Sequence, residues 1–108
     1  MTTVKKYPVK MNYRFNLDSM RTHALVILDE MRDGEIETVH LMGQDMDETA
    51  VERFIEEIEE LMSKMYYPVS GKDYGRIKAI SDERNMIRYA TCISKGMSEN
   101  DAASAFFE

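Results

Sequence analysis

Apolar residues recur at intervals of three and four between residues 47 and 65, and this spacing predicts an α-helix with one buried face. Asp47 is expected to cap this helix, because its carboxylate can accept a hydrogen bond from a free N–H group of the first turn. The dipeptide Tyr67-Pro68 is expected to end it, because a residue before proline disfavours the helical conformation. The apolar positions are Val51, Phe54, Ile55, Ile58, Leu61, Met62 and Met65. We expect the rest of the chain to be organised around this helix.

The N-terminal third of the chain predicts a strand and then a second helix. Apolar residues alternate with polar ones up to Phe15, so residues 4–15 are expected to form a strand with one buried face. From residue 19 to residue 32 the helical spacing returns, with Gly34 as the closing glycine. An alternative stays open here, because Asp33-Gly34 is also a strong hairpin signal that would pair strands at residues 23–31 and 36–42.

The order of the elements then suggests a topology. Residues 35–42 predict a strand, and a turn at residues 43–45 leads into the central helix. A strand, helix, strand, helix order favours two strands paired in parallel through a right-handed crossover. The hairpin alternative would instead give antiparallel strands.

The C-terminal third predicts a loop followed by helices. Residues 68–75 are rich in turn formers and are expected to form the loop. Helical patterns follow over residues 77–80 and 81–95, either separate or merged, and Gly96 is expected to close them in a Schellman motif. Ser98 is expected to cap a last short helix. The predicted fold class is therefore α+β, with one domain over residues 1–108. A small sheet of two or three strands is covered by three to four helices, and a C-terminal αα-hairpin closes the core.

Charge is distributed very unevenly along the chain, whose net charge is −6. Residues 29–63 carry thirteen acids and two bases, whereas residues 1–28 carry five bases and one acid, and residues 64–95 carry seven bases and three acids. The net charge argues against a general attraction to nucleic acid or to anionic membranes. Part of the asymmetry is expected to cancel inside the fold, and the remainder could steer a partner.

Candidate chemistry is sparse. Cys92 is the only cysteine, which fits a reducing compartment and predicts a cytoplasmic protein without disulfides. The longest apolar run, residues 24–28, is too short to span a bilayer, so no membrane association is expected. The two histidines, His23 and His40, stand in no metal-ligand spacing, and no nucleophile motif is present. We therefore expect no catalytic residues, no metal, no cofactor and no enzyme activity.

The leading hypothesis is a small non-enzymatic regulatory or inhibitory protein that binds a partner protein with a basic surface. The contact would be the acidic outer face of the central helix. This hypothesis requires that the carboxylates form an outward patch and are not neutralised by bases from the flanking segments. The expected partner-binding residues are Glu48, Glu52, Glu56, Glu59 and Glu60.

Two other function classes are weighed against it. The basic segment at residues 72–95 could bind nucleic acid, which is less favoured because the last predicted helix has no Lys or Arg. Alternatively, the loop at residues 68–75, which has Tyr66, Tyr67 and Tyr74 in or beside it, could form a small-ligand sensor or an enzyme site. A homodimer is also compatible with a small domain rich in Met and aromatic residues. The nucleic-acid or ligand contacts would be Tyr67, Lys72, Tyr74, Arg76, Lys78, Arg84 and Arg88.

Overall fold

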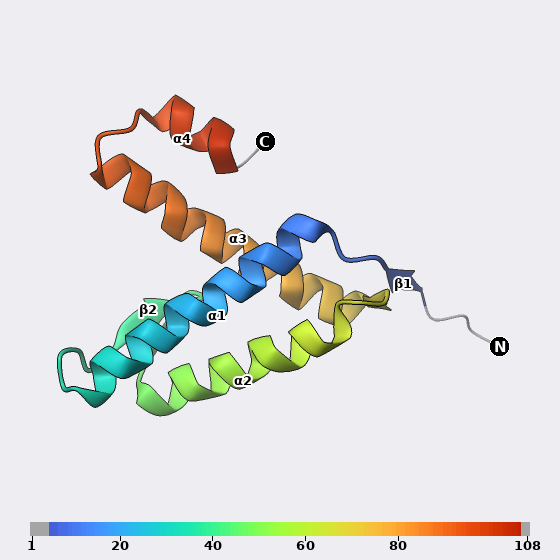
Figure 1. The fold of residues 1–108 in the computed structure, drawn as a ribbon, viewed down its shortest axis with the longest axis horizontal. Helices are drawn as coiled ribbons and strands as arrows, with labels where there is room; N and C mark the ends of the chain where they lie inside the picture. The colour runs from blue at the N-terminus through green and yellow to red at the C-terminus, as the bar shows by residue number, and fades with distance from the viewer. Residues whose placement is uncertain (1–4, 107–108) are drawn as a thin grey trace.

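A computed structural model describes residues 5–106 of the protein as four helices and four short strands (Figure 1). The helices are α1 (Met11–Arg32), α2 (Glu48–Lys64), α3 (Gly71–Ser94) and α4 (Glu99–Phe106). The strands are β1 (Lys6–Tyr7), β2 (Val39–Leu41), β3 (Gln44–Met46) and β4 (Val69–Ser70). Strand β1 pairs with β4 and β2 pairs with β3, both antiparallel. The predicted α+β class is confirmed, with the strands divided between two small sheets.

Helix α2 has the cap and the buried face that its sequence predicts. The side chain of Asp47 accepts a hydrogen bond of 2.9 Å from the backbone N–H of Ala50. Val51 and Ile58 are fully buried, and the other apolar positions of the stripe pack with them against α1. The helix ends at Lys64, before the Tyr67-Pro68 dipeptide. This helix and α1 lie side by side and enclose most of the core (Figure 1).

Helix α1 begins at Met11, so the predicted strand at residues 4–15 is wrong beyond the two residues of β1. Val9 and Tyr13 are buried, whereas Met11 and Phe15 are exposed. An alternating pattern contains pairs four residues apart, and one face of a helix accommodates such pairs as well as a strand does. The predicted helix at 19–32 is confirmed as the larger part of α1. The alternative hairpin of residues 23–31 with 36–42 is wrong, because residues 23–31 are helical.

The segment between α1 and α2 forms a tight antiparallel hairpin, so the predicted parallel crossover is wrong. Val39 faces Met46 in the register of β2 and β3. The turn consists of Met42 (φ 55°) and Gly43 (φ 75°), and two successive left-handed residues match the twist of a hairpin. The backbone N–H of Met42 donates a 2.5 Å hydrogen bond to the carboxylate of Glu83, which ties the hairpin to α3.

The turn-rich stretch at residues 68–75 is strand β4 and the first turn of α3, and not a loop. Ser70 caps α3, since its hydroxyl accepts a hydrogen bond from the backbone N–H of Asp73 at 3.2 Å. The two predicted helical patterns merge, and α3 runs without a break to Ser94. The predicted Schellman motif is confirmed, because the N–H of Met97 donates to the carbonyl of Cys92 at 3.0 Å, around Gly96 with its positive φ.

The two halves of α3 have different environments. Ile77, Ile80 and Ser81 are fully buried, but no later side chain of α3 is. The end of α3, with the helix α4 packed on it, projects away from the rest of the fold as an arm (Figure 1). We call residues 86–106 the arm and residues 5–85 the body. The radius of gyration is 15.5 Å, against about 13 Å for a compact domain of this length. The predicted αα-hairpin is therefore present, but it does not close the core.

Candidate functional site

Arginines of α1 pair with the predicted acidic surface. The guanidinium of Arg32 lies 2.9 Å from the carboxylate of Glu52 and 3.7 Å from that of Glu48. The guanidinium of Arg21 lies 3.0 Å from the carboxylate of Glu59. These pairs connect α1 to the outer side of α2, so the arginines of α1 partly cancel the acids of α2.

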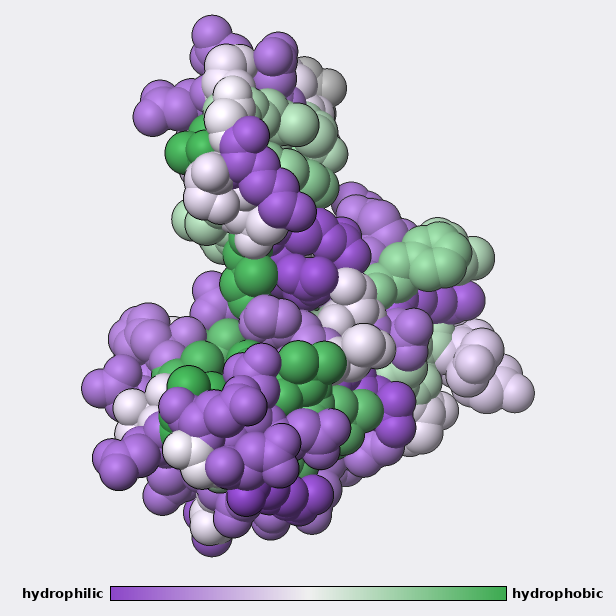
Figure 2. Space-filling model, turned by 60° about the vertical axis from the view of Figure 1, so that its left-hand side comes forward, coloured by the Kyte–Doolittle hydropathy of each residue, from purple (hydrophilic) through white to green (hydrophobic). Residues whose placement is uncertain are grey.

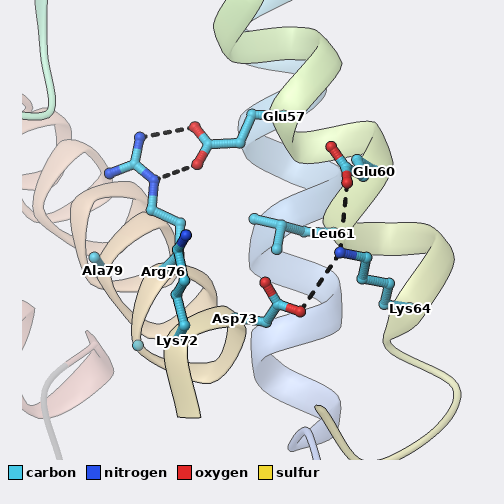
Figure 3. Close-up of a pocket in the computed structure, with 9 residues that line it drawn as sticks. Glu57, Glu60, Leu61, Lys64, Lys72, Asp73, Arg76 and Ala79 are labelled. Carbon is cyan, nitrogen blue, oxygen red and sulfur yellow. Dashed lines mark hydrogen bonds and ion pairs between the residues drawn. The ribbon is translucent and has the colours of Figure 1, made fainter. Parts of the chain in front are cut away.

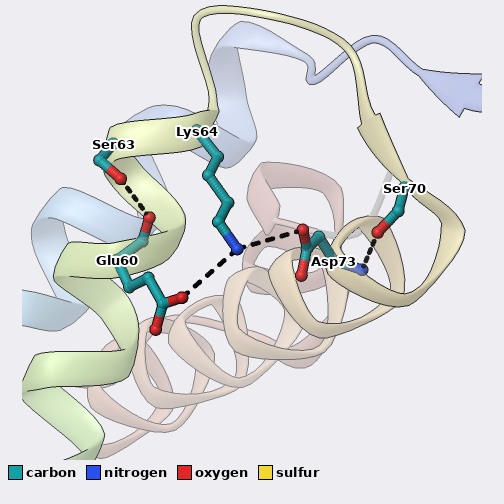
Figure 4. Close-up of polar contacts among 5 residues, drawn as sticks. All are labelled: Glu60, Ser63, Lys64, Ser70 and Asp73. Carbon is teal, nitrogen blue, oxygen red and sulfur yellow. Dashed lines mark hydrogen bonds and ion pairs between the residues drawn. The ribbon is translucent and has the colours of Figure 1, made fainter.

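Lys64 holds a further member of the acidic surface (Figure 4). Its ammonium lies 3.4 Å from Glu60 on the same helix and 3.5 Å from Asp73 on α3. The two carboxylates, Asp73 first, raise the pKa of Lys64. Among the five predicted contact residues, only Glu56 is in no ion pair with another residue in the range 5–106. The acidic face of α2 is thus neutralised at four of its five predicted positions.

A groove of about 450 Å³ runs between α2 and the start of α3 (Figure 3). Arg76 bridges its two sides, with Nε 2.5 Å and one Nη 2.8 Å from the carboxylate oxygens of Glu57. This bidentate contact raises the pKa of Arg76. Leu61 and Ala79 provide apolar lining, and Lys72 lines the groove without a carboxylate partner in the described part of the chain. The ion pairs across the groove link α2 to α3. Because these pairs match most of its charges, the groove presents few unsatisfied polar groups to a ligand.

The two tyrosines of the predicted ligand site, Tyr67 and Tyr74, have different surroundings in the structure. Tyr74 stacks on Tyr7 with 5.2 Å between ring centroids and meets Tyr13 edge-on at 6.0 Å. Burial raises the pKa of Tyr13. This cluster joins β1, α1 and α3, which is a packing role. Tyr67 belongs to the link before β4 and is largely exposed.

The bases of residues 72–95 serve separate neighbours. Arg76 contacts α2, Lys78 pairs with Asp82 on its own helix at 3.0 Å, and Arg84 and Arg88 contact α1. The predicted basic segment therefore forms no continuous track of free cations along α3.

Arg84 and Arg88 take part in a polar network where α1 crosses α3. Asn16 lies at its centre and is only 4% exposed. Its amide nitrogen donates to the hydroxyl of Ser81 at 2.8 Å and to the side-chain oxygen of Asn85 at 3.1 Å, while its amide oxygen accepts from Arg88 at 2.7 Å. The side chains of Asn16 and Ser81, the two buried polar residues of this network, thus have partners, which offsets the cost of removing them from water.

Ser19, one turn further along α1, joins both arginines. Its hydroxyl oxygen accepts a hydrogen bond of 2.8 Å from Nε of Arg84 and another of 2.8 Å from an Nη of Arg88. Within residues 5–106 neither guanidinium contacts a carboxylate, although the chain has twenty acids. We call this set the polar crossing: Asn16, Ser19, Ser81, Arg84, Asn85 and Arg88.

Electrostatics at the polar crossing are locally positive. Burial and the neighbouring Arg88 lower the pKa of Arg84. Burial and the charge of Arg84 also lower the pKa of His23 on α1, against an opposing effect of Glu30. Two adjacent guanidinium groups without a carboxylate partner in residues 5–106 therefore form a positive spot on a protein whose net charge is −6.

Exposed apolar side chains flank the polar crossing along α1. Met11, Phe15 and Val26 lie on the same helical stripe as Ser19, and Phe15 is 67% exposed. Figure 2 shows strongly hydrophilic side chains in the recess where the arm joins the body, with apolar ones beside them. We call the combined area the neck surface, formed by Met11, Phe15, Ser19, Val26, Arg84 and Arg88.

Of the residues in the polar crossing and the neck surface, only Arg84 and Arg88 were predicted from the sequence as candidate contacts. Arg84 and Arg88 were expected as nucleic-acid or ligand contacts, but no role at a site was expected for Asn16 or Ser19, because the helix was expected to begin at residue 19. The signal was available: Asn16 continues the buried face of α1 by one turn before Met20. A polar residue on a buried helical face indicates a hydrogen-bonded partner elsewhere in the fold.

Other possible sites give little chemistry. His40 and Asp45 face each other across the hairpin at 3.0 Å, and both are exposed. In residues 5–106 no three or more His, Cys, Asp or Glu side chains gather as metal ligands would, and no helix there has the length and apolarity to cross a membrane. No protein-family model, curated protein or solved structure shows significant similarity to the chain.

Proposed function

We propose that this protein is a small non-enzymatic binding protein that recognises another protein through its neck surface. The observation that carries the proposal is the exposed apolar stripe of α1 beside two arginines that have no carboxylate partner in residues 5–106. Every other arginine of α1 and α3 that forms an ion pair lies on the α2 side of the body.

The neck surface has the composition of a protein interface. Aromatic residues, Met and Arg are enriched at such interfaces, and they supply most of the binding energy when they are desolvated. Phe15 and Met11 contribute little to the core, since more than half of each side chain is exposed. Apolar side chains grouped on one helical stripe of a small domain indicate a contact surface.

The acidic face of α2 supports a weaker form of the proposal. A basic partner there would meet Glu56 directly, but it would have to displace Arg32 and Arg21 to reach Glu52 and Glu59. Exposed ion pairs are worth roughly 1 kcal/mol or less each, so displacement is feasible but offers little net gain. The neck surface requires no such exchange.

Affinity capture from the native host with matched variants tests the proposal. We expect a host protein that is retained by the wild-type chain, lost with Phe15→Ser and still retained by Tyr66→Ser, a change to an equally exposed aromatic residue elsewhere on the surface. Glu56→Gln reports on the acidic face. Partners lost only with Glu56→Gln, or capture that is unaffected by Phe15→Ser, would overturn the assignment to the neck surface.

A further inference from the structure

We infer that the polar crossing is a phosphate-binding site, and that the partner segment presents a phosphorylated serine or threonine side chain to Arg84 and Arg88. The site itself is argued from hydrogen-bond donors and charge. The identity of the carrier, a protein segment, rests on the proposed function.

Unused donors converge at this site. Arg84 uses only its Nε, and Arg88 uses one hydrogen of each Nη, in hydrogen bonds to Asn16 and Ser19. Their other N–H groups have no partner in the described part of the chain and are open to solvent. The hydroxyl of Ser19 accepts from both arginines, and its own hydrogen has no acceptor within residues 5–106. Two guanidinium groups and one hydroxyl can therefore donate to the three acceptor oxygens of a phosphate.

Charge favours a phosphate over a carboxylate. A carboxylate carries one negative charge and would offset only one of the two adjacent guanidinium groups. A phosphorylated side chain carries about −1.5 to −2 at neutral pH, which matches both. Elsewhere in the body, the charges of Arg21, Arg32 and Arg76 are already offset by carboxylates of the chain. The charge of Arg84 also contributes, after burial, to the lowered pKa of His23.

The surroundings favour a protein segment over nucleic acid as the carrier. Nucleic acid is held by a row of cations that follows its successive phosphates. Arg76 and Lys78, the nearest bases before Arg84 on α3, are already paired with carboxylates. Apolar side chains, Phe15 and Val26, lie on the stripe to either side of Ser19 instead. One phosphate between apolar contacts is the pattern of phosphorylated side-chain recognition by arginines.

The first experiment titrates the whole chain with O-phospho-L-serine and follows it by NMR. L-Serine, which lacks the phosphate, is the first control, and L-glutamate is the control for a side-chain carboxylate. We expect phosphoserine to shift the Ser19 amide and the Arg84 and Arg88 side-chain signals, with L-glutamate binding at least about tenfold more weakly. Bound phosphate should also raise the pKa of the His23 imidazole, because its negative charge offsets Arg84, while Glu30 is present in both states. Absence of any shift at millimolar phosphoserine would overturn the site.

Variants then assign the effect to the arginines. Arg84→Gln and Arg88→Gln should each weaken phosphoserine binding about tenfold, the loss expected for a charge-assisted contact. Arg53→Gln makes the same change of charge at an exposed residue of α2 that forms no ion pair with residues 5–106, and it should leave binding unchanged. If either glutamine variant unfolds, Arg84→Lys and Ser19→Ala replace it in the test. Each removes hydrogen-bond donors from the site and should still weaken phosphoserine binding. Full affinity in all four variants would overturn the assignment.

The outcomes also separate the site from its carrier. Phosphoserine binding together with a partner retained only in phosphorylated form supports the whole inference. A partner lost with Phe15→Ser but no phosphoserine binding would leave the proposed function standing and remove the phosphate site. A single-stranded oligonucleotide that binds more tightly than phosphoserine, with a steep dependence on salt, would replace the protein carrier with nucleic acid.

Discussion

The body and the arm share one helix, α3, but different interactions hold its two halves. In the body, Ile77 and Ile80 are fully buried, and Arg76 is fixed by two hydrogen bonds to Glu57. Further along, Met86 is 51% exposed, and Arg84 and Arg88, on either side of the start of the arm, have only neutral partners in the described residues. Regularity of the helix is the same in both halves, so secondary structure alone does not tell which residues stabilise the fold.

The comparison separates residues that stabilise the fold from residues that remain available for contact. Ion pairs link α1 and α3 to α2 in the body, and apolar residues of all three helices are buried together in its core. At the neck, apolar side chains and guanidinium groups both remain accessible. Substitutions of buried or ion-paired residues of the body should therefore change stability, whereas substitutions on the neck surface should change binding.

The largest effect is expected from a cavity in the core. Ile58→Ala removes a fully buried side chain of α2 and should lower the free energy of unfolding by about 2–5 kcal/mol. Met86→Ala, at the start of the arm, should change it by less than about 0.5 kcal/mol. Urea denaturation followed by circular dichroism measures both. Equal losses for the two variants would mean that the arm is as much a part of the core as α2.

A slightly smaller loss is expected from the centre of the polar crossing. Asn16→Leu removes three hydrogen bonds and leaves the buried Ser81 and the half-buried Asn85 and Arg88 without them, so the free energy of unfolding should fall by about 2–3 kcal/mol. Asn12→Leu, on the exposed side of the same helix, is the matched control and should have little effect. If Asn16→Leu is as stable as the wild-type chain, the polar crossing does not fix the position of α3 on α1.

An ion-pair prediction tests the body from its surface. A double-mutant cycle with Glu57→Gln and Arg76→Gln should give a coupling free energy of about 0.5–1 kcal/mol, since both side chains are more than a third exposed and solvent screens the pair. The value should shrink in high salt. A coupling near zero would show that the bidentate geometry adds nothing to the packing of α2 on α3.

The sequence was informative where periodicity and caps agreed. Helix α2 was predicted with its Asp47 cap, and the end of α3 was predicted with Gly96, because both signals are local. The strand expected over residues 4–15 failed because Tyr13, which fits the alternation, also fits the buried helical face that continues through Leu17 and Met20. The β2–β3 hairpin was missed because Met42, an unusual residue for a left-handed turn position, gives no turn signal.

The candidate site was harder to predict, because charge along the sequence does not reveal which charges meet in space. The acidic block at residues 29–63 suggested an outward patch, yet Arg21, Arg32 and Lys64 reach four of its predicted contact glutamates. Conversely, Arg84 and Arg88 are two of several bases in residues 72–95. Nothing in the sequence indicates that these two contact neutral side chains of α1 and not carboxylates. Pairings between residues more than sixty positions apart, such as Asn16 with Ser81, have no local signature.

The smallest effect, and the most specific to the neck, is a dependence of stability on pH through His23. Burial and Arg84 lower the pKa of His23 in the folded state below its ordinary 6.5. As the pH falls below 6.5, the unfolded chain therefore takes up a proton at this site before the folded chain does, so stability decreases until the pH has passed the lowered folded-state pKa. Above about pH 7.5 the imidazole is neutral in both states and has no effect.

Two variants isolate this contribution. His23→Gln should remove the decline between about pH 7.5 and 5.5, a range above the titration of most carboxyl groups, while His40→Gln leaves His23 in place and should keep the decline. Arg84→Gln should reduce it, because one of the two causes of the lowered pKa is gone. Denaturation curves across this pH range measure the effect. A decline that persists in His23→Gln would assign it to another group, and a decline of full size in Arg84→Gln would mean that Arg84 exerts no measurable positive field at His23.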